Sequence, residues 1–335
     1  MAVGVGQAEE VTRLPHAIER DSAKASCPVC GDRIRLRGGK IDRASGDRFT
    51  YTRCVGCRFL FVNPRPTRAA LAEWYRRGDS PRGVGTWHAF RDDPIAMEEA
   101  AVDPRRLIPW GTRHVTSGGR RVLDLGAGLG LFAREALARG MAVTALELDR
   151  HAADELEREL QIPVLRLPFE EFVPDGGFDL IIMNQVLEHA HDPVDWARKL
   201  RAALTPGGVV VVGLPHAGSF WQRSIGMADP YLKPPLHLNH FTRRSLTLLL
   251  SRAGLRVVAS RTYSRLPWNL LSRKARLPAT VRPVVDRLFK GGQRLPLALL
   301  DRFGLGIMLE VCARREGSMR LASEGARSSA ARGAG

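Results

Sequence analysis

A chain of 335 residues, 44% of them hydrophobic, is long enough for one α/β domain and a smaller module, and its composition is that of a globular protein. Its formal net charge is +16, with 51 Lys and Arg against 35 Asp and Glu, which is consistent with a phosphorylated substrate, nucleic acid or anionic lipid as partner, or with an arginine-rich proteome. A signal-peptide pattern and a run of about 18 apolar residues are both missing, so we expect a cytoplasmic protein with reduced cysteines.

The first part of the chain contains two Cys-x-x-Cys pairs. Residues 1–24 are expected to be a flexible leader, and the cysteines follow directly: Cys27, Cys30, Cys54 and Cys57. Each pair places two thiolates on a tight knuckle, and two knuckles complete a tetrahedral Cys₄ zinc site. We therefore predict a structural zinc ribbon over residues 25–63, with hairpin strands and turn inside Asp42–Thr52, rather than disulfides or a redox pair. Cys312 is expected to be a small core residue.

Residues 64–112 are expected to form a helical connector that covers a neighbouring site. Thr67 is a helix-capping residue, and the helix that follows contains Leu71, Trp74 and Tyr75.

The most informative stretch is residues 122–130, with the sequence Val-Leu-Asp-Leu-Gly-Ala-Gly-Leu-Gly. An apolar strand containing Asp124 leads into a turn at Gly126, Gly128 and Gly130, and a helical pattern follows. Glycine permits close approach of a ligand to the backbone, and the next helix points its unpaired N–H groups at that place. The pattern predicts a nucleotide-like ligand in the crevice of a doubly wound sheet.

A second strand ends at Glu147, about twenty residues past the glycines. A carboxylate there can accept hydrogen bonds from two ribose hydroxyls, which fits NAD and S-adenosylmethionine (SAM) alike. Asp124 lies two residues before Gly126, within reach of an amino-acid ammonium group. The presence of this acid favours SAM over NAD as the ligand.

Strands and helices alternate through the rest of the chain, which predicts an α/β fold with a parallel sheet and helices on both faces. We predict a tail over 316–335 that is disordered. The predicted strands are 121–125, 142–147, 164–166, 178–183, 209–214, 255–260 and 306–313, and the predicted helices are 151–160, a helix from Pro193 to the turn at 205–208, and 245–253.

A basic helical insertion is predicted over 264–304, before the last strand. It carries nine Lys and Arg against two Asp among apolar residues. One interpretation is a pair of amphipathic helices that pack on the sheet edge or on a second subunit. The other is peripheral contact with an anionic membrane, which would suit a lipid-linked acceptor.

These residues together resemble class I SAM-dependent methyltransferases, over about 110–315, in order and in spacing. The resemblance rests on residues 122–130, Glu147, 178–189, 204–208 and the last two predicted strands, 255–260 and 306–313. It implies a Rossmann-like seven-stranded sheet, with the methyltransferase domain at 113–315. The ribbon, together with Asn63-Pro64-Arg65-Pro66 and residues 234–242, is similar to a bacterial subgroup that often accompanies saccharide, cell-envelope or natural-product genes.

The resemblance also implies a donor site. Its members would be Asp124, Gly126, Gly128 and Gly130 along the methionine part of SAM, Glu147 at the ribose, Leu148 and Phe169 at the adenine, and Asn184 and Gln185 beside the methyl group.

Histidines are the candidate bases for removing a proton from a hydroxyl acceptor. His189 beside Glu188, and His240, are predicted to be catalytic, whereas His216 and His237 are predicted to bind substrate. The alternative is that these side chains only satisfy backbone groups or pack in loops. A related quinone-type pattern has an acid where this chain has Gln185, which argues against a catalytic metal.

Three functions are compatible with these features of the sequence. The first is methyl transfer to a small-molecule or glycoconjugate acceptor, at a hydroxyl oxygen, by a cytoplasmic enzyme or one peripheral at the inner membrane. The second is an RNA methyltransferase that uses the ribbon and the arginines on phosphates; the ribbon has few aromatics for base stacking, and the chain lacks an Asn/Asp-Pro-Pro-Tyr motif after the fourth strand. The third is a non-catalytic SAM-binding scaffold. The sequence does not determine the acceptor or the oligomeric state.

Overall fold

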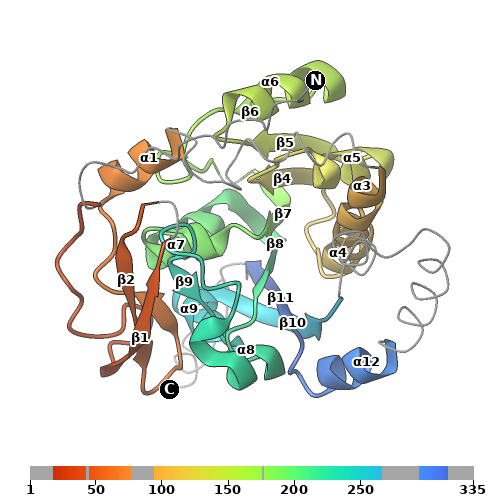
Figure 1. Cartoon of the computed structure of the whole chain (residues 1–335). Helices are drawn as coiled ribbons and strands as arrows, with labels where there is room; N and C mark the ends of the chain where they lie inside the picture. Colours follow the sequence, from red (N-terminus) through yellow and green to blue (C-terminus); the bar gives the residue numbers. More distant parts are fainter. Residues whose placement is uncertain (1–17, 43–44, 77–93, 176, 266–293, 316–335) are drawn as a thin grey trace, which may run out of the picture.

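The computed structural model describes residues 18–42, 45–76, 94–175, 177–265 and 294–315 as two sheets with surrounding helices (Figure 1). Parts of the predicted leader, connector, basic insertion and tail lie outside the described residues, namely 1–17, 77–93, 266–293 and 316–335. In the described ranges, no helix is long and apolar enough to cross a membrane.

The larger sheet has seven strands. They are β4 (Arg121–Leu125), β5 (Ala142–Leu146), β6 (Val164–Leu165), β7 (Phe178–Asn184), β8 (Leu204–Pro215), β10 (Leu255–Tyr263) and β11 (Met308–Arg315). Their order is β10-β11-β8-β7-β4-β5-β6. Strands β6, β5, β4, β7 and β8 are parallel, while β11 runs antiparallel to both β8 and β10. The predicted Rossmann-like seven-stranded sheet is confirmed, and its parallel strands deliver their carboxyl ends to one edge.

Helices cover both faces of this sheet. They are α1 (Arg68–Arg76), α3 (Pro94–Ala100), α4 (Val102–Thr112), α5 (Leu131–Ala138), α6 (Arg150–Leu160), α7 (Pro193–Ala203), α8 (Phe220–Ile225), α9 (Arg243–Arg252) and α12 (Arg294–Arg302), with short 3₁₀ turns at Leu187–His189 and Gly226–Ala228. Apolar side chains of α4, α5 and α6 pack on one face, and those of α7 and α9 on the other. The strands between them are therefore almost continuously apolar, as expected for a sheet buried on two sides.

Local capping explains where several helices begin. Asp192 accepts hydrogen bonds from the N–H groups of Val194 and Asp195, and Pro193 occupies the first turn of α7. Thr242 and Ser245 form a reciprocal capping box at the start of α9. The predicted Thr67 cap is also present, because its hydroxyl oxygen accepts from Ala70 N–H at 3.1 Å.

The smaller sheet contains the ribbon and one strand from the larger domain. Its order is β1 (Ile34–Ile41), β2 (Arg48–Cys54), β3 (Leu60–Val62) and β9 (Asn239–His240), all antiparallel. The prediction that Asp42–Thr52 holds both hairpin strands was wrong, because that range contains the turn and most of β2, while β1 precedes it. Alternation is weak in β1, where two glycines interrupt the pattern.

Strand β9 belongs to the proline-rich segment 234–242. Leu60 pairs with His240 and Phe61 with Asn239, so this segment completes the ribbon sheet. Figure 1 shows the ribbon, in red and orange, at one end of the molecule beside β9 and α9.

Candidate active site

The glycine turn after β4 leaves open space for a ligand. Gly126, Gly128 and Gly130 have φ values of 73°, 51° and 69°, in the left-handed region that favours glycine. A Cβ at Gly126 would lie 2.7 Å from Val186 Cγ2, and one at Gly130 would overlap Leu156. Apart from Gly128 itself and its two chain neighbours, no heavy atom in the described part of the chain lies within 4 Å of the position of a Cβ at Gly128. The outer two glycines are thus needed for packing, whereas the middle one faces an empty space.

Two buried acids lie beside this turn. Glu147 accepts hydrogen bonds from the N–H groups of Gly128, at 2.7 Å, and of Asp149, at 2.9 Å. Asp124 accepts from the N–H of Ala133 in the first turn of α5, at 3.0 Å. Burial raises the pKa of both carboxyls, that of Asp124 to about 7. A ligand that offers cationic or hydroxyl donors would therefore stabilise the ionised form of both carboxyls.

The two predicted adenine contacts differ in their surroundings. The Leu148 side chain is 50% exposed next to Glu147, which is unusual for a large apolar residue at the end of a core strand. Phe169 is buried, stacks on Phe172 with ring centres 5.6 Å apart, and meets the edge of Trp196. Phe169 thus packs in the core, whereas Leu148 is the one of the two whose apolar surface is accessible to a ligand.

The end of β7 has an unusual backbone. Gln185 has a φ of 59°, and its N–H donates to the carbonyl of Gly213 at 2.7 Å. A side chain at Gly213 would overlap the Asn184 amide oxygen. Positive φ in a non-glycine residue is sparsely populated and is often found at functional sites. Asn184 and Gln185 lie on the same sheet edge as the glycine turn.

A cluster of buried acid and imidazole groups follows this strand. Glu188 is 1% exposed, and neither of its carboxylate oxygens has a hydrogen-bond partner in the described part of the chain. Ligand atoms of Glu188, His189 and His237 all lie within 4.8 Å of one another. That spacing brings three predicted site residues together, and a carboxylate with two imidazoles is also a donor set that divalent cations accept.

Burial sets the protonation of this cluster. It raises the pKa of Glu188 to about 8 and lowers the pKa of His189 to about 4 and that of His240 to about 3. His237 pairs through Nδ1 with the carbonyl of Tyr231 at 2.8 Å, and His240 pairs through Nε2 with the carbonyl of His237 at 3.3 Å. A carbonyl only accepts, so these nitrogens carry the protons, and the other ring nitrogens are the basic ones.

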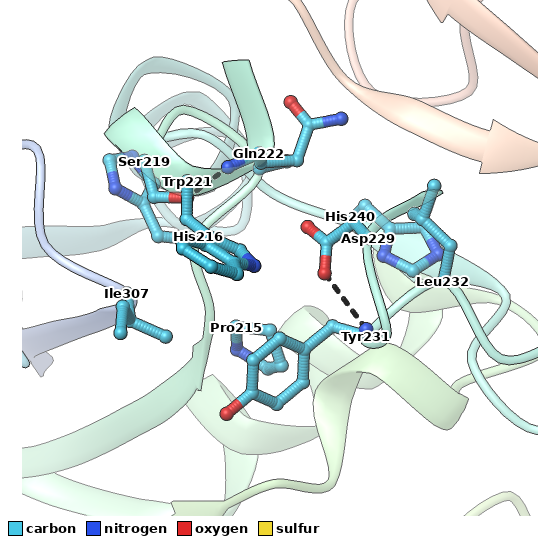
Figure 2. Close-up of a pocket in the computed structure, with 11 residues that line it drawn as sticks. Pro215, His216, Ser219, Trp221, Gln222, Asp229, Tyr231, Leu232, His240 and Ile307 are labelled. Carbon is cyan, nitrogen blue, oxygen red and sulfur yellow. Dashed lines mark hydrogen bonds between the residues drawn. The ribbon is translucent and has the colours of Figure 1, made fainter. Parts of the chain in front are cut away.

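A small pocket opens at the carboxyl end of β8, where Figure 2 shows its lining side chains. It has room for about one water molecule. His216 and His240 line it together with residues that the sequence did not single out, which are Pro215, Ala217, Ser219, Trp221, Gln222, Asp229, Tyr231, Leu232 and Ile307. Neither Trp221, in the short helix α8, nor Asp229, in the loop after it, belongs to a motif or a periodic pattern that could have marked it in the sequence.

The four ribbon thiols converge as predicted. Sγ atoms of Cys27 and Cys57 are 3.7 Å apart, those of Cys30 and Cys54 are 3.3 Å apart, and all four lie within 4.8 Å of one another. Tetrahedral thiolates with Zn–S of about 2.3 Å have edges of about 3.8 Å, so this set fits zinc. The Cys57 thiol lowers the pKa of Cys27 to about 5, and the pKa of Cys57 itself is raised. Cys312 is buried in the sheet core, apart from the four.

In a comparison with known protein families, residues 98–260 match a family described as a methyltransferase domain. Among curated relatives, the ubiquinone biosynthesis O-methyltransferase of Caulobacter sp. (strain K31) is 30% identical over 156 residues, which are 43% of this chain and 58% of that protein. An uncharacterized methyltransferase of Mycobacterium sp. (strain JLS) is 29% identical over 183 residues, or 50% of this chain and 71% of that protein. The chain thus spans less than two thirds of the Caulobacter relative.

Among solved structures, one similar chain is the Burkholderia thailandensis 1,6-didemethyltoxoflavin-N1-methyltransferase, which has bound substrate and S-adenosylhomocysteine. It is 21% identical, with a TM-score of 0.48, and the alignment covers 78% of this chain and 98% of that chain.

Proposed function

We propose that this chain, which carries a methyltransferase domain over residues 98–260, is a class I SAM-dependent methyltransferase acting on a hydroxyl oxygen of a small-molecule or glycoconjugate acceptor. The observation that carries the proposal is the open space at Gly128 beside the Glu147 carboxylate, together with the exposed side chain of Leu148, the residue after that acid. Close backbone approach, a carboxylate for two ribose hydroxyls and an apolar surface for adenine are the features that this donor needs.

The names of the curated relatives support oxygen as the atom methylated, because several are O-methyltransferases. SAM supplies the methyl group as a reactive sulfonium. The residues of this chain hold the acceptor in line and take the proton that its hydroxyl loses. Neutral His189 and His240, with Glu188 beside the former, are the groups that we assign to proton removal, and His216 and His237 are assigned to acceptor binding.

The donor site is tested by calorimetry with SAM. Replacing Glu147 with Ala removes the acceptor of two ribose hydrogen bonds, and we expect the dissociation constant to rise about 10- to 100-fold. Gly128→Val should abolish binding, because its side chain fills the open space. Glu171→Ala, which removes an exposed acid, is the control and should bind as the wild type does. Heat of binding that is absent in the wild type, or unchanged in Glu147→Ala, contradicts the proposal.

We further propose that the four converging thiols hold a structural zinc ion. All four coordination positions are filled by protein, so the site stabilises the ribbon and takes no part in methyl transfer.

We also propose that the enzyme docks on an anionic membrane, which would place it on the cytoplasmic face of the inner membrane with access to a lipid-linked acceptor. Most of the predicted basic insertion lies outside the described residues, but α12 belongs to it. Leu295, Leu299 and Phe303 are exposed at four-residue intervals, which places them on one side of this helix. Exposed Phe220 begins α8, and its N–H donates to Leu305 just after α12, so the two elements adjoin. Exposed apolar side chains beside basic ones favour an anionic lipid surface.

Co-sedimentation with vesicles tests this docking. We expect binding to vesicles with phosphatidylglycerol, and about tenfold weaker binding for the double variant Leu299→Ser/Phe303→Ser, since each change removes apolar surface that would enter the lipid. Val173→Ser removes an exposed apolar side chain elsewhere and should have no effect. Equal binding of the double variant and the wild type would refute membrane docking through α12.

A further inference from the structure

The cysteine ribbon contacts two segments that line the small pocket at the carboxyl end of β8. His240 is part of β9, which pairs with β3 of the ribbon. The Thr242 hydroxyl, just after β9, donates to the carbonyl of Cys57 at 3.3 Å, and Arg252 donates to the carbonyl of Val29 at 2.6 Å. Both carbonyls belong to the cysteine knuckles, so the position of His240 depends on the folded ribbon.

The ribbon also holds the loop that contains Asp229. Lys40 of β1 donates to the carbonyl of Asp229 at 2.6 Å and to that of Leu232 at 3.0 Å. These bonds fix the backbone at two points of the loop that forms one side of the pocket.

Asp229 brings an incompletely paired carboxylate into this pocket. The residue is 4% exposed, and its Oδ1 accepts from the N–H of Tyr231 at 2.9 Å. Within the described ranges, nothing donates to Oδ2. Figure 2 shows the carboxylate among His240, Tyr231 and Trp221. Because Asp229 lines the pocket and Oδ2 is not among the fully buried unpaired atoms of the described residues, this oxygen can accept a hydrogen bond from a ligand in the pocket.

Tyr51 of β2 packs against His240, with ring centres 5.5 Å apart. Its hydroxyl is buried and has no hydrogen-bond partner among the described residues. Burial and the charge of Asp229 raise the pKa of Tyr51, so the hydroxyl stays protonated beside that carboxylate.

We propose that Asp229 and His240 form the subsite for the acceptor hydroxyl, and that the zinc ribbon positions them through Tyr51 and Lys40. The inference rests on the proposed methyltransferase function and names the part of the acceptor that the pocket takes. On binding, the acceptor hydroxyl donates its single hydrogen to Asp229 Oδ2. As the oxygen bonds the methyl group and the sulfonium C–S bond of SAM breaks, the hydroxyl turns and that same proton passes to the basic nitrogen of His240. Since the pocket has room for about one water, only the hydroxyl enters, and the ring or chain that carries it remains outside against Trp221.

The test uses radiolabelled methyl transfer from SAM to fractionated cell extract, with the labelled fraction titrated against each variant. For Asp229→Asn, we expect at least ten times more of that fraction for half-maximal rate, because the hydroxyl loses a charged acceptor. Tyr51→Leu removes the ring that packs against His240 and should require about three times more. SAM affinity measured by calorimetry should stay within twofold in both variants, since the donor residues are unchanged.

The neighbouring Thr52 provides a matched control. The Thr52 hydroxyl is also buried and finds no partner in the described ranges, but alternation along the strand places it on the opposite face of β2. Thr52→Val should leave the titration unchanged, and thermal unfolding should show that all three variants are folded.

Each outcome has a distinct meaning. If Asp229→Asn titrates like the wild type, the subsite is refuted. If Tyr51→Leu and Thr52→Val behave alike, Tyr51 does not position the subsite. If the wild type binds SAM and labels no fraction, methyl transfer itself is refuted, and the subsite with it.

Discussion

Glu188 combines two unfavourable features in one side chain. It is almost fully buried, and both carboxylate oxygens lack hydrogen-bond partners among the described residues. Such a group lowers the stability of the free protein, and natural proteins retain this kind of defect mainly where function requires it. Its place directly after β7, next to His189, supports the catalytic assignment.

The stability of the protein should report this defect through pH. The pKa of Glu188 is raised from 4.5 to about 8, so the folded chain keeps a proton that the unfolded chain releases. Stability contributed by this group is therefore present below about pH 4.5 and is lost as the pH rises to about 8. Glutamine has no such proton. We therefore expect the free energy of unfolding of Glu188→Gln, relative to that of the wild type, to rise by at least about 1 kcal/mol from pH 5 to pH 9.

Urea denaturation at the two pH values measures this difference. Glu171→Gln changes an exposed acid and should follow the wild-type pH dependence. If the free energy of unfolding changes with pH in the same way in the wild type and in Glu188→Gln, Glu188 is ionised in the folded protein.

At the scale of elements, the segment Asn63-Pro64-Arg65-Pro66 joins the ribbon to the larger domain. The Asn63 amide pairs in both directions with the backbone of Lys24, at 2.8 and 3.0 Å. The buried Arg65 guanidinium donates to the carbonyl of His191 and, at 2.7 Å, to the amide oxygen of Asn239. Arginine suits this place because its fixed fork of donors reaches several acceptors at once.

Helix α4 is attached to the sheet by a second buried ionic group. Arg106 forms two hydrogen bonds with the Glu310 carboxylate of β11, which also pairs with Arg261 of β10 at 2.7 Å. The two guanidinium groups lie over the rings of Tyr263 and Trp110, at 3.6 and 4.2 Å. The network fixes α4 on the antiparallel half of the sheet, close to Gly213 and the end of β7.

Across the whole molecule, the ribbon and the larger domain share one hydrophobic core. Buried Cys27, Cys54 and Cys57 belong to the same apolar cluster as Leu123 and Ile181 of the central strands. Together with the β3–β9 pairing, this continuity makes the two parts a single cooperative unit rather than two independent modules.

Loss of zinc should therefore destabilise the entire protein. Because metal binding contributes directly to folding of such sites, we expect Cys54→Ala to lower the melting temperature of the whole chain by about 5 °C or more, in one transition. Metal analysis should find zinc in the wild type and in Cys312→Ala, which alters a core thiol outside the site, but not in Cys54→Ala. A calorimetric scan in which the larger domain melts at the wild-type temperature after zinc loss would contradict a shared core.

The sequence by itself determined the features that depend on near neighbours in the chain. The glycine turn, the cap at Thr67 and the Cys-x-x-Cys knuckles each need only a few consecutive residues, and the alternation of strand and helix patterns indicates a parallel sheet. Gly126, Gly128 and Gly130 could be named for this reason. Their different roles, packing for the outer two and open space at the middle one, required the positions of Val186 and Leu156.

Only the tertiary structure decided which distant segments meet. The pairing of β3 with β9, the core position of Phe169 and the placement of Asp229 beside His240 all involve residues far apart in the chain, or a loop without periodicity. Such contacts form because the folded core must bury apolar surface and pair backbone groups wherever complementary partners lie, and no local pattern encodes that choice.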